Sequence, residues 1–508
     1  MSTISLSMIV KNEEKLLREC LQSVKDVVDE IIIVDTGSTD NTIQIAESFG
    51  ASVYQHKWNN DFSEARNYSL SKVTSDWVLY LDADERLDAS AKHLLKKLTS
   101  NRDKIGYRCK IYNVDEINKK PKLQRYTRLF RNIKGIRFSG KAHEQIDDSL
   151  FAHGCKIQNT ELLINHFGYN IDQEGLKQKA KRNLDLLLLD YKNNPSGYCA
   201  FQIANSYSIL KDADNTYKYY SLAINDLSLE KEYRAYSLSS IAEYHLKSND
   251  IPNAYTSINE ALENDSKNMI ANLTASQIYE KVEKSNEAIE FCKKALELNR
   301  NLIENSDNRL LDVIFDDEKI IYHGLTISYN SNITAGIEFF FNDLEKTKRA
   351  NNSEWEKESA SIQKLASDST LTNEELDGLI TIINENNLDF YLALTKHYSH
   401  IESKLTLDQR LIEKFNNNIS VRNRLGYDLS KAGNNYEAAE VFEKLLTENS
   451  EEATPVFYLI PIYLELKRFD DIQQLITTSK KRFSNNEIVI RHINTFEQKI
   501  NSYLQKIN

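Results

Sequence analysis

Two stretches in the first hundred residues decide the fold class: EIIIVDTGSTDNT (residues 30–42) and WVLYLDADE (residues 77–85). Each contains an unbroken apolar run (31–34 and 77–81), typical of a strand buried on both faces of a parallel sheet, followed by a polar turn with carboxylates. Further strands are expected at 4–10 and 52–55. Helices are expected at 13–27, 39–49 and 62–73, with Asn12 and Ser38 at the start of the first two. This alternation predicts a doubly wound parallel sheet, whose ligands bind beyond the carboxyl ends of its strands.

The composition excludes several other classes of protein. The chain has 508 residues, 41% of them hydrophobic, with only 14 Gly and 5 Pro, which predicts more than one folded domain and favours long helices. A net charge of -11 gives no basic surface for nucleic acid, and no apolar run could form a transmembrane segment. The N-terminus lacks a signal-peptide pattern, and the 5 scattered cysteines suit reduced thiols. A cytoplasmic protein is therefore expected.

After Gly175 the pattern becomes helical and repeats. Small residues recur at a spacing of about 34 residues, the period of the tetratricopeptide repeat, and let two helices of a hairpin approach closely. One earlier copy is offset by a few more residues, which predicts one longer turn between repeats. Weaker copies follow near Gly426 and Ala438, and near Tyr463 and Ile472. Ordinary antiparallel helices without a binding groove remain the alternative. The three clear sets are Ala204, Thr216 and Ala223; Ala242, Ala254 and Ala261; and Ser276, Ala288 and Ala295.

Carboxylates follow two of the expected strands. Asp35 ends the first stretch, where it could bind a ribose or a base edge; a turn in which Asp35 and Asp40 only satisfy backbone amides is the alternative. Asp82 and Asp84 end the second stretch. Two carboxylates at one strand end can bind a hard divalent cation such as Mn²⁺ or Mg²⁺, whereas a solvated acidic turn is the alternative.

The order of four motifs resembles the inverting family 2 glycosyltransferases, which have the nucleotide-diphospho-sugar transferase (GT-A) fold. These motifs are MIVKNEE (8–14), VDTGSTDNT (34–42), WNNDFSEARN (58–67) and LYLDADE (79–85). The resemblance implies a nucleotide sugar donor, with UDP-glucose or a related UDP-hexose expected, and a divalent metal on its diphosphate held by Asp84 and Asp82. For Arg66 a helix-surface ion pair is the alternative. The implied donor-binding residues are Val10, Asn12, Glu13, Asp35, Lys57, Asp61, Arg66, Asp82 and Ala83.

Later motifs complete the expected site. In RYTRLFR (125–131), Arg128 could supply fixed positive charge for the leaving diphosphate. In RFSGKAHE (137–144), Glu144 is the favoured catalytic base and His143 the second candidate, although the family often places its base in an acidic pair elsewhere and a core role is common for such a histidine. His166, in NHFGYN (165–170), is expected as a third metal ligand, with a structural histidine as the alternative.

Several of these segments are also similar to the peptide S-glycosyltransferases that modify glycosylated bacteriocins (glycocins), of the sublancin transferase type. The similarity implies transfer of a sugar to a Cys, Ser or Thr side chain of a peptide or protein acceptor held by the repeats; a homodimer is a further expectation. This chain starts closer to its first strand and has a longer helical part. Three alternatives are a cell-envelope transferase acting on a saccharide or lipid-linked glycan, a nucleotidyltransferase, and a repeat scaffold with a decayed catalytic domain.

The expected organisation combines two fold classes. An α/β GT-A catalytic domain covers 1–175 and extends at most to about 190, and an all-α region follows it. Within that region tetratricopeptide repeats cover 176–300, a helical stretch of degenerate repeats or spacer covers 301–420, and tetratricopeptide-like repeats cover 421–508.

Overall fold

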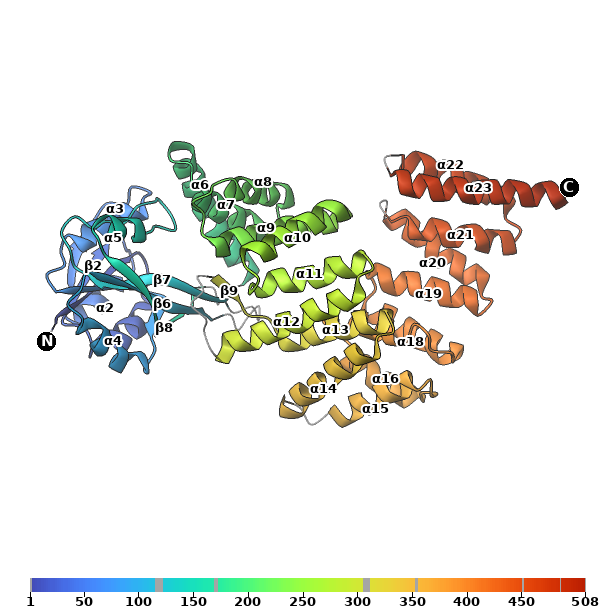
Figure 1. The fold of residues 1–508 in the computed structure, drawn as a ribbon, viewed down its shortest axis with the longest axis horizontal. Coiled ribbons are helices and arrows are strands. Elements are labelled where there is room, and N and C mark those ends of the chain that lie inside the picture. The colour runs from blue at the N-terminus through green and yellow to red at the C-terminus, as the bar shows by residue number, and fades with distance from the viewer. Residues whose placement is uncertain are drawn as a thin grey trace. The chain divides into compact units, whose positions relative to one another are not determined.

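The computed structural model describes residues 2–114, 122–168, 172–304, 311–351, 355–449, 452–484 and 486–507. The chain divides into two compact units, Met1–Ile321 and Tyr322–Asn508. The first unit contains the α/β domain together with the first helical repeats, and the second is helical (Figure 1). The predicted boundaries near 175, 300 and 420 subdivide these units and stay predictions.

The predicted parallel sheet forms the first half of the α/β domain. Strand β1 (Ile4–Val10) lies between β2 (Glu30–Asp35) and β4 (Trp77–Tyr80), and β3 (Ser52–Gln55) pairs with β2; all these pairs are parallel. Most apolar side chains on β1, β2 and β4 are buried, and the sequences of β2 and β4 hold unbroken apolar runs because both faces of these strands are covered. The helices that connect the strands are α1 (Leu17–Val24), α2 (Thr42–Ser48) and α3 (Phe62–Leu70).

The second half of the sheet is antiparallel in part, which the predicted doubly wound parallel sheet did not include. The full order of the main path is β3-β2-β1-β4-β7-β6-β8-β5, with β7 antiparallel to β4. These later strands alternate buried and partly exposed residues instead of forming apolar runs, which made them harder to predict. The added elements are β5 (Glu85–Leu87), α4 (Ala91–Thr99), β6 (Ile105–Asn113), β7 (Lys122–Arg131), α5 (Asp147–Ala152) and β8 (Lys156–His166).

A further strand lies inside the stretch predicted to be wholly helical. Strand β9 (Leu311–Val313) pairs antiparallel with β7, off the main strand path. Its three residues are too few for a periodic pattern, and only pairing with a distant strand defines them as β structure.

Helices α1 and α2 begin later in the chain than predicted. Asn12 and Ser38, the residues expected to cap them, instead hydrogen-bond across to each other's loops. Helix α1 begins at Leu17, and Asn12 has a left-handed backbone with a φ of 57°. The Asn12 side chain accepts a hydrogen bond from the Thr39 amide at 2.8 Å, and the Ser38 hydroxyl accepts one from the Asn12 amide at 2.9 Å. Both loops follow strands that end at the same edge of the sheet. Asn12 and Ser38 therefore join two loops and cap no helix.

Helix pairs follow the sheet in the first unit, and the predicted small-residue positions lie between them. Except for the half-buried Thr216, every member of the three sets is fully buried, as close helix packing requires. The connection over 225–230 is longer than the one over 265–268, as predicted. The helices are α6 (Gln173–Asn193), α7 (Gly197–Ile209), α8 (Ala213–Ile224), α9 (Lys231–Lys247), α10 (Ile251–Asn264), α11 (Met269–Lys281) and α12 (Ser285–Glu304).

The second unit contains helix pairs with a shared packing contact. A Cβ atom added to Gly426 would lie 2.6 Å from the Phe442 ring, and one added to Gly324 would lie 2.3 Å from the Phe340 ring. The same spacing between glycine and phenylalanine in both pairs indicates that the stretch 301–420 contains at least one repeat-like pair. Between residues 388 and 403 two helices are separated by a turn and irregular chain at 395–400.

The helices of this part of the chain are as follows. Helix α13 (Asp317–Asn330) crosses the boundary between the units. It is followed by α14 (Thr334–Asn351), α15 (Trp355–Ala366), α16 (Asn373–Ile382), α17 (Leu388–Leu394), α18 (Ile401–Lys414), α19 (Ile419–Lys431), α20 (Asn435–Glu448), α21 (Thr454–Glu465), α22 (Phe469–Arg482) and α23 (Glu487–Ile507).

Two glycine substitutions test this packing. Gly426→Ala is expected to lower the free energy of unfolding by about 1 to 3 kcal/mol, because its methyl group would overlap the Phe442 ring. Gly378→Ala in α16 is the matched control, since no atom lies within 4 Å of its added methyl group. It should stabilise the helix by about 1 kcal/mol. Urea unfolding of the full chain measures both, and equal effects would contradict the packing argument.

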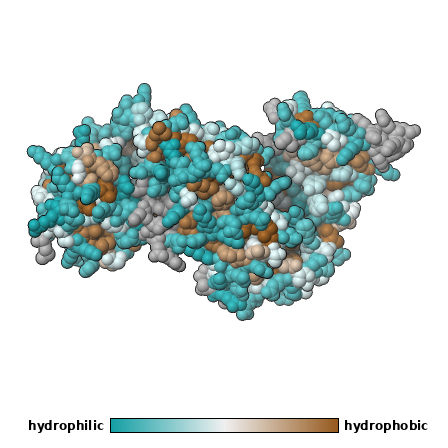
Figure 2. Space-filling model, viewed as in Figure 1, coloured by the Kyte–Doolittle hydropathy of each residue, from teal (hydrophilic) through white to brown (hydrophobic). Residues whose placement is uncertain are grey.

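The surface gives no sign of a membrane span. No helix among the described residues combines the length and apolar character that crossing a membrane requires. On the face drawn in Figure 2, hydrophobic residues occur in small separate groups among hydrophilic ones.

Candidate active site

A cavity of about 1130 Å³ opens at the predicted edge of the sheet, within the first unit. Its wall combines residues from the ends of β1 and β4, from the segment after β7, and from helices α6 and α7. It brings together most of the predicted site residues: Val10, Glu13, Arg66, Asp82, Ala83, Asp84, Arg128, His143, Glu144 and His166.

Four predicted donor-binding residues do not line this cavity. Asp35 is 1% exposed, and its carboxylate accepts the amides of Gly37 and Ser38 at 3.0 and 3.1 Å, the arrangement expected of the turn alternative. Asn12 bonds to the loop after β2, as described above. Lys57 and Asp61 lie outside the cavity wall, and the Asp61 carboxylate caps α3 by accepting from the Glu64 amide at 3.0 Å, so their part in donor binding stays a prediction. The sequence neighbours Lys11, Thr36, Trp58 and Phe62 line the cavity instead.

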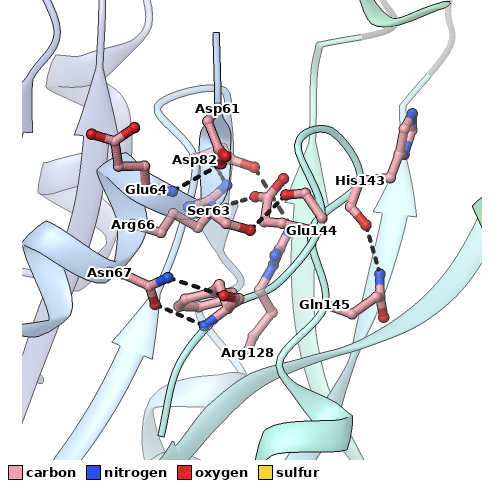
Figure 3. Close-up of polar contacts among 12 residues, drawn as sticks. Asp61, Ser63, Glu64, Arg66, Asn67, Asp82, Arg128, His143, Glu144 and Gln145 are labelled. Atoms are coloured by element: carbon pink, nitrogen blue, oxygen red, sulfur yellow. Dashed lines mark hydrogen bonds and ion pairs between the residues drawn. The ribbon is translucent and has the colours of Figure 1, made fainter. Parts of the chain in front are cut away.

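Arg66 links two parts of the site. Its Nη2 atom donates to Asp82 Oδ1 at 2.6 Å, and its Nε atom donates to Glu144 Oε1 (Figure 3). Burial disfavours the charged guanidinium, but the carboxylates of Asp82 and Glu144 outweigh it and raise the pKa of Arg66 above its usual value. The side chain is only 7% exposed, so the alternative of a helix-surface ion pair is wrong. Arg66 therefore fixes the Glu144 carboxylate relative to the end of β4.

Arg128 lies beneath Asp82 and is already paired. Its Nη2 atom donates to Glu85 Oε1 at 2.7 Å and lies 3.6 Å from Asp82 Oδ2, with the guanidinium 4.3 Å from the centre of the Tyr80 ring. Burial alone would raise the pKa of Asp82, but Arg66 and Arg128 lower it well below its usual value. The charge of Arg128 is thus shared by two carboxylates. Glu85, which sequence analysis missed, directly follows the Asp-Ala-Asp motif.

Asp84 contacts His166 and Lys179. Its Oδ2 atom lies 3.3 Å from His166 Nε2 and 3.8 Å from Lys179 Nζ. Burial opposes ionisation of Asp84, yet the hydrogen bond and charge of His166, followed by the charge of Lys179, lower its pKa. A Cβ atom at Gly168 would lie 2.1 Å from the same carboxylate oxygen and 2.6 Å from His166 Nε2, so only glycine lets these side chains pack this closely against the backbone.

The predicted three metal ligands are not gathered in one place. Asp84 and His166 lie together, whereas Asp82 is held by the two arginines. Across the described ranges, no group of three or more His, Cys, Asp and Glu side chains could by itself hold an ion. The pair formed by Asp84 and His166 could still hold Mn²⁺ or Mg²⁺, because it offers an oxygen and a nitrogen ligand 3.3 Å apart in the cavity wall, with Lys179 beside them. Divalent ions at phosphate sites take their remaining ligands from substrate and water.

Glu13 adds to the negative charge of this wall. Burial and the carboxylates of Asp84 and Asp82 raise its pKa to about 7, with Lys179 opposing them. Burial is the larger cause, and with a pKa of about 7 part of the Glu13 population keeps its proton at neutral pH. The carboxylates of Asp82 and Asp84, which Glu13 senses, would suit a cation brought in with the donor.

The raised pKa of Glu13 predicts a pH dependence of stability. Between its usual value of 4.5 and about 7, the folded protein keeps a proton that the unfolded chain releases. The Glu13 contribution is therefore fully present below 4.5 and is lost as pH rises through about 7. Glu13→Gln should raise the free energy of unfolding more at pH 7.5 than at pH 5, relative to Glu14→Gln as control. Urea unfolding at both pH values checks this, and an equal shift at both would contradict it.

Helices α6 and α7 supply wall residues that sequence analysis missed. From α6 come Lys179 and Arg182, which are three residues apart and so lie on one helix face. From α7 come Tyr198, Gln202 and Asn205. The basic run KQKAKR (177–182), just after the last predicted motif, was the available signal.

Residues 5–167 match the family described as glycosyl transferase family 2. This segment is a family 2 glycosyltransferase domain. The predicted family resemblance and the GT-A fold class, an α/β domain followed by a long helical region, are thereby confirmed.

The chain is also similar to curated proteins over part of its length. It is 38% identical over 200 residues to a TPR repeat-containing protein of Synechococcus elongatus, which covers 38% of this chain and 49% of that protein. It is 32% identical over 195 residues to the SPbeta prophage-derived glycosyltransferase SunS of Bacillus subtilis, which covers 36% of this chain and 44% of that protein. The chain thus spans about half the length of these relatives.

Solved structures match the chain only partially. Glucosyl-3-phosphoglycerate synthase from Mycobacterium tuberculosis, in complex with Mn²⁺ and UDP-glucose, is 25% identical, with 22% of this chain and 44% of that chain covered and a TM-score of 0.20. S. aureus TarS is 16% identical, with 52% of this chain and 53% of that chain covered and a TM-score of 0.27.

Proposed function

We propose that this protein is an inverting glycosyltransferase that moves a sugar from a nucleotide diphosphate sugar to a Cys, Ser or Thr side chain of a peptide held by its helical repeats. One observation carries the proposal. A single cavity runs from the carboxyl ends of β1 and β4, in the family 2 domain, to the side chains of α7 in the first repeat. A donor and a peptide acceptor could meet there without a lid or a second site.

The donor would lie along the strand ends. Val10, Lys11 and Thr36 would contact its nucleoside, and Asp84 and His166 would hold a divalent ion at its diphosphate. The ion, when bound, would neutralise charge on the diphosphate. Lys179 and Arg182 would add positive charge at the same end of the cavity. Arg66 and Arg128 would act by keeping Asp82 ionised and fixed.

The acceptor would be activated by Glu144. In one displacement, the acceptor sulfur or oxygen would form a bond to the anomeric carbon while the bond from that carbon to the diphosphate oxygen breaks. The acceptor proton would pass to the Glu144 carboxylate, and the nucleoside diphosphate would leave with the bonding electron pair. No protein nucleophile is required.

His143 remains the second candidate for the base. It lines the same cavity, and burial lowers the pKa of its imidazole, so the ring is neutral and has a nitrogen that could accept a proton. Figure 3 shows the His143 ring directed away from the Arg66–Glu144 pair. The Glu144 carboxylate, by contrast, is linked to Asp82, because Arg66 pairs with both. This placement favours Glu144.

The experiment combines a panel of nucleotide sugars with two classes of acceptor. Peptides that contain Cys, Ser or Thr are compared with short saccharides, with Mn²⁺ or with chelator, and products are identified by mass. A peptide gaining one hexose in the Mn²⁺ reactions is the expected result. Transfer only to saccharides would favour the cell-envelope alternative, and no sugar transfer from any donor would contradict the proposed activity.

A further inference from the structure

The loop that carries Glu144, residues 139–145, has a backbone that needs outside support. Ser139 and Gln145 close its base through two backbone hydrogen bonds, both 2.9 Å long. Within it His143 has a φ of 52°, in the left-handed region that residues other than glycine rarely adopt. Such conformations persist only where surrounding contacts hold them. The neighbours of this loop therefore decide where Glu144 lies.

Helix α6 provides the first of these contacts. The Lys141 amide donates to Asp190 Oδ2 at 3.1 Å. The next residue, Ala142, is buried in an apolar cluster whose other members come from α6 and α7: Leu184, Leu187, Cys199 and Ile203. The loop is thus anchored on helices that lie outside the segment matched by the family.

Helix α7 provides a second contact through Tyr198. Gln145 Nε2 donates to Tyr198 Oη at 2.9 Å and to the His143 carbonyl oxygen at 3.1 Å. Gln202 Nε2 donates to the same tyrosine oxygen at 2.8 Å. Burial raises the pKa of Tyr198 well above its usual value, so the phenol stays neutral. One oxygen atom thereby joins α7 to the residue that follows Glu144.

We propose that Tyr198 is a positioning residue of the first repeat, which holds Glu144 in place through Gln145. The helical region would then be part of the catalytic apparatus as well as a binding surface for the acceptor. Tyr198 and Gln202 also line the cavity, so an acceptor that touches α7 would touch the hydrogen bonds that fix the loop. The catalytic part of this inference rests on the proposed role of Glu144.

Tyr198→Phe tests the proposal because it removes only the oxygen atom. The ring keeps its contacts with Phe201 and Tyr233, at centroid distances of 6.5 and 5.4 Å, so the variant should fold. We expect kcat to fall about tenfold, the effect of one lost hydrogen bond on a catalytic position, with the acceptor KM and donor affinity unchanged. In a Gln145→Ala background the same change should cause no further loss.

Tyr207→Phe on the same helix is the matched control, since Tyr207 lies outside the cavity wall and should give wild-type rates. A rise in acceptor KM without a fall in kcat would overturn the proposal, because it would make Tyr198 an acceptor contact. Additive effects in the double variant would overturn it as well.

Amide hydrogen exchange separates this inference from the proposed function. Loop amides of Lys141 and Gln145 should exchange about tenfold faster in Tyr198→Phe than in the wild type or in Tyr207→Phe, whether or not sugar is transferred. Unchanged exchange would refute the anchoring by Tyr198. Faster exchange in a protein that transfers no sugar would support the anchoring and reject the glycosyltransferase assignment.

Discussion

Asp84→Ala is expected to reduce sugar transfer by about 1000-fold or more, because the divalent ion would lose its charged ligand at the diphosphate. Asp84 faces His166 at 3.3 Å and Lys179 at 3.8 Å, and its side chain is 20% exposed, so the substitution leaves no fully buried unpaired charge. The variant should therefore stay folded. Calorimetric titration with UDP should show Mn²⁺-dependent binding in the wild type and weak, Mn²⁺-independent binding in the variant.

Asp26→Ala is the control for this experiment. Asp26 forms an exposed ion pair with Lys92 at 3.4 Å, and removing such a pair has little effect on stability. It should leave transfer and nucleotide binding unchanged. Full activity of Asp84→Ala in the presence of a chelator would show that the carboxylate has no part in metal binding.

Glu144→Gln is expected to lower turnover by about 100-fold to 10,000-fold, the usual contribution of a general base. The amide keeps the size of the side chain, and Arg66 retains Asp82 as a partner at 2.6 Å, so donor affinity should change little. Turnover is measured at saturating donor and acceptor, and donor affinity by calorimetry. Glu64→Gln, the same substitution at an exposed position of α3, is the control and should have the turnover of the wild type.

His143→Gln distinguishes the two candidate bases. If Glu144 takes the proton, His143→Gln should have the smaller effect on turnover, since the His143 ring points away from the Arg66–Glu144 pair. Unchanged turnover in Glu144→Gln with a large loss in His143→Gln would move the base to the histidine.

The sequence was sufficient for the parallel half of the sheet and insufficient for the rest. Strands 4–10 and 52–55 have the predicted bounds. Strands β2 and β4 are covered on both faces for most of their length, and such strands have apolar sequences that a local pattern reveals. The antiparallel half has alternating sequences, and β9 depends on pairing with a strand far away in the chain. Such pairing is non-local and leaves little trace in a short segment.

The helical repeats show a similar limit. Alanine at a fixed period was visible in the first pairs. In the stretch 301–420 the same packing uses Gly324 against Phe340, and it becomes recognisable only beside the contact between Gly426 and Phe442. In both pairs the two helices pack closely because one has a glycine at the position where the other has a phenylalanine ring.

The sequence by itself indicated ten of the residues in the cavity wall, because strand ends and ordered motifs mark them, but it did not indicate Glu85, Lys179 or Arg182. Only the tertiary structure decided what each of them does there. Arg128 forms an ion pair with Glu85, and Asp82 forms one with Arg66. The Asp35 carboxylate accepts a backbone amide of its own turn. A charge acts according to the partners within a few ångströms of it, and those partners come from strands and helices far apart in the chain. The same reason hid Lys179 and Tyr198, which reach the site from helices that follow the last recognisable motif.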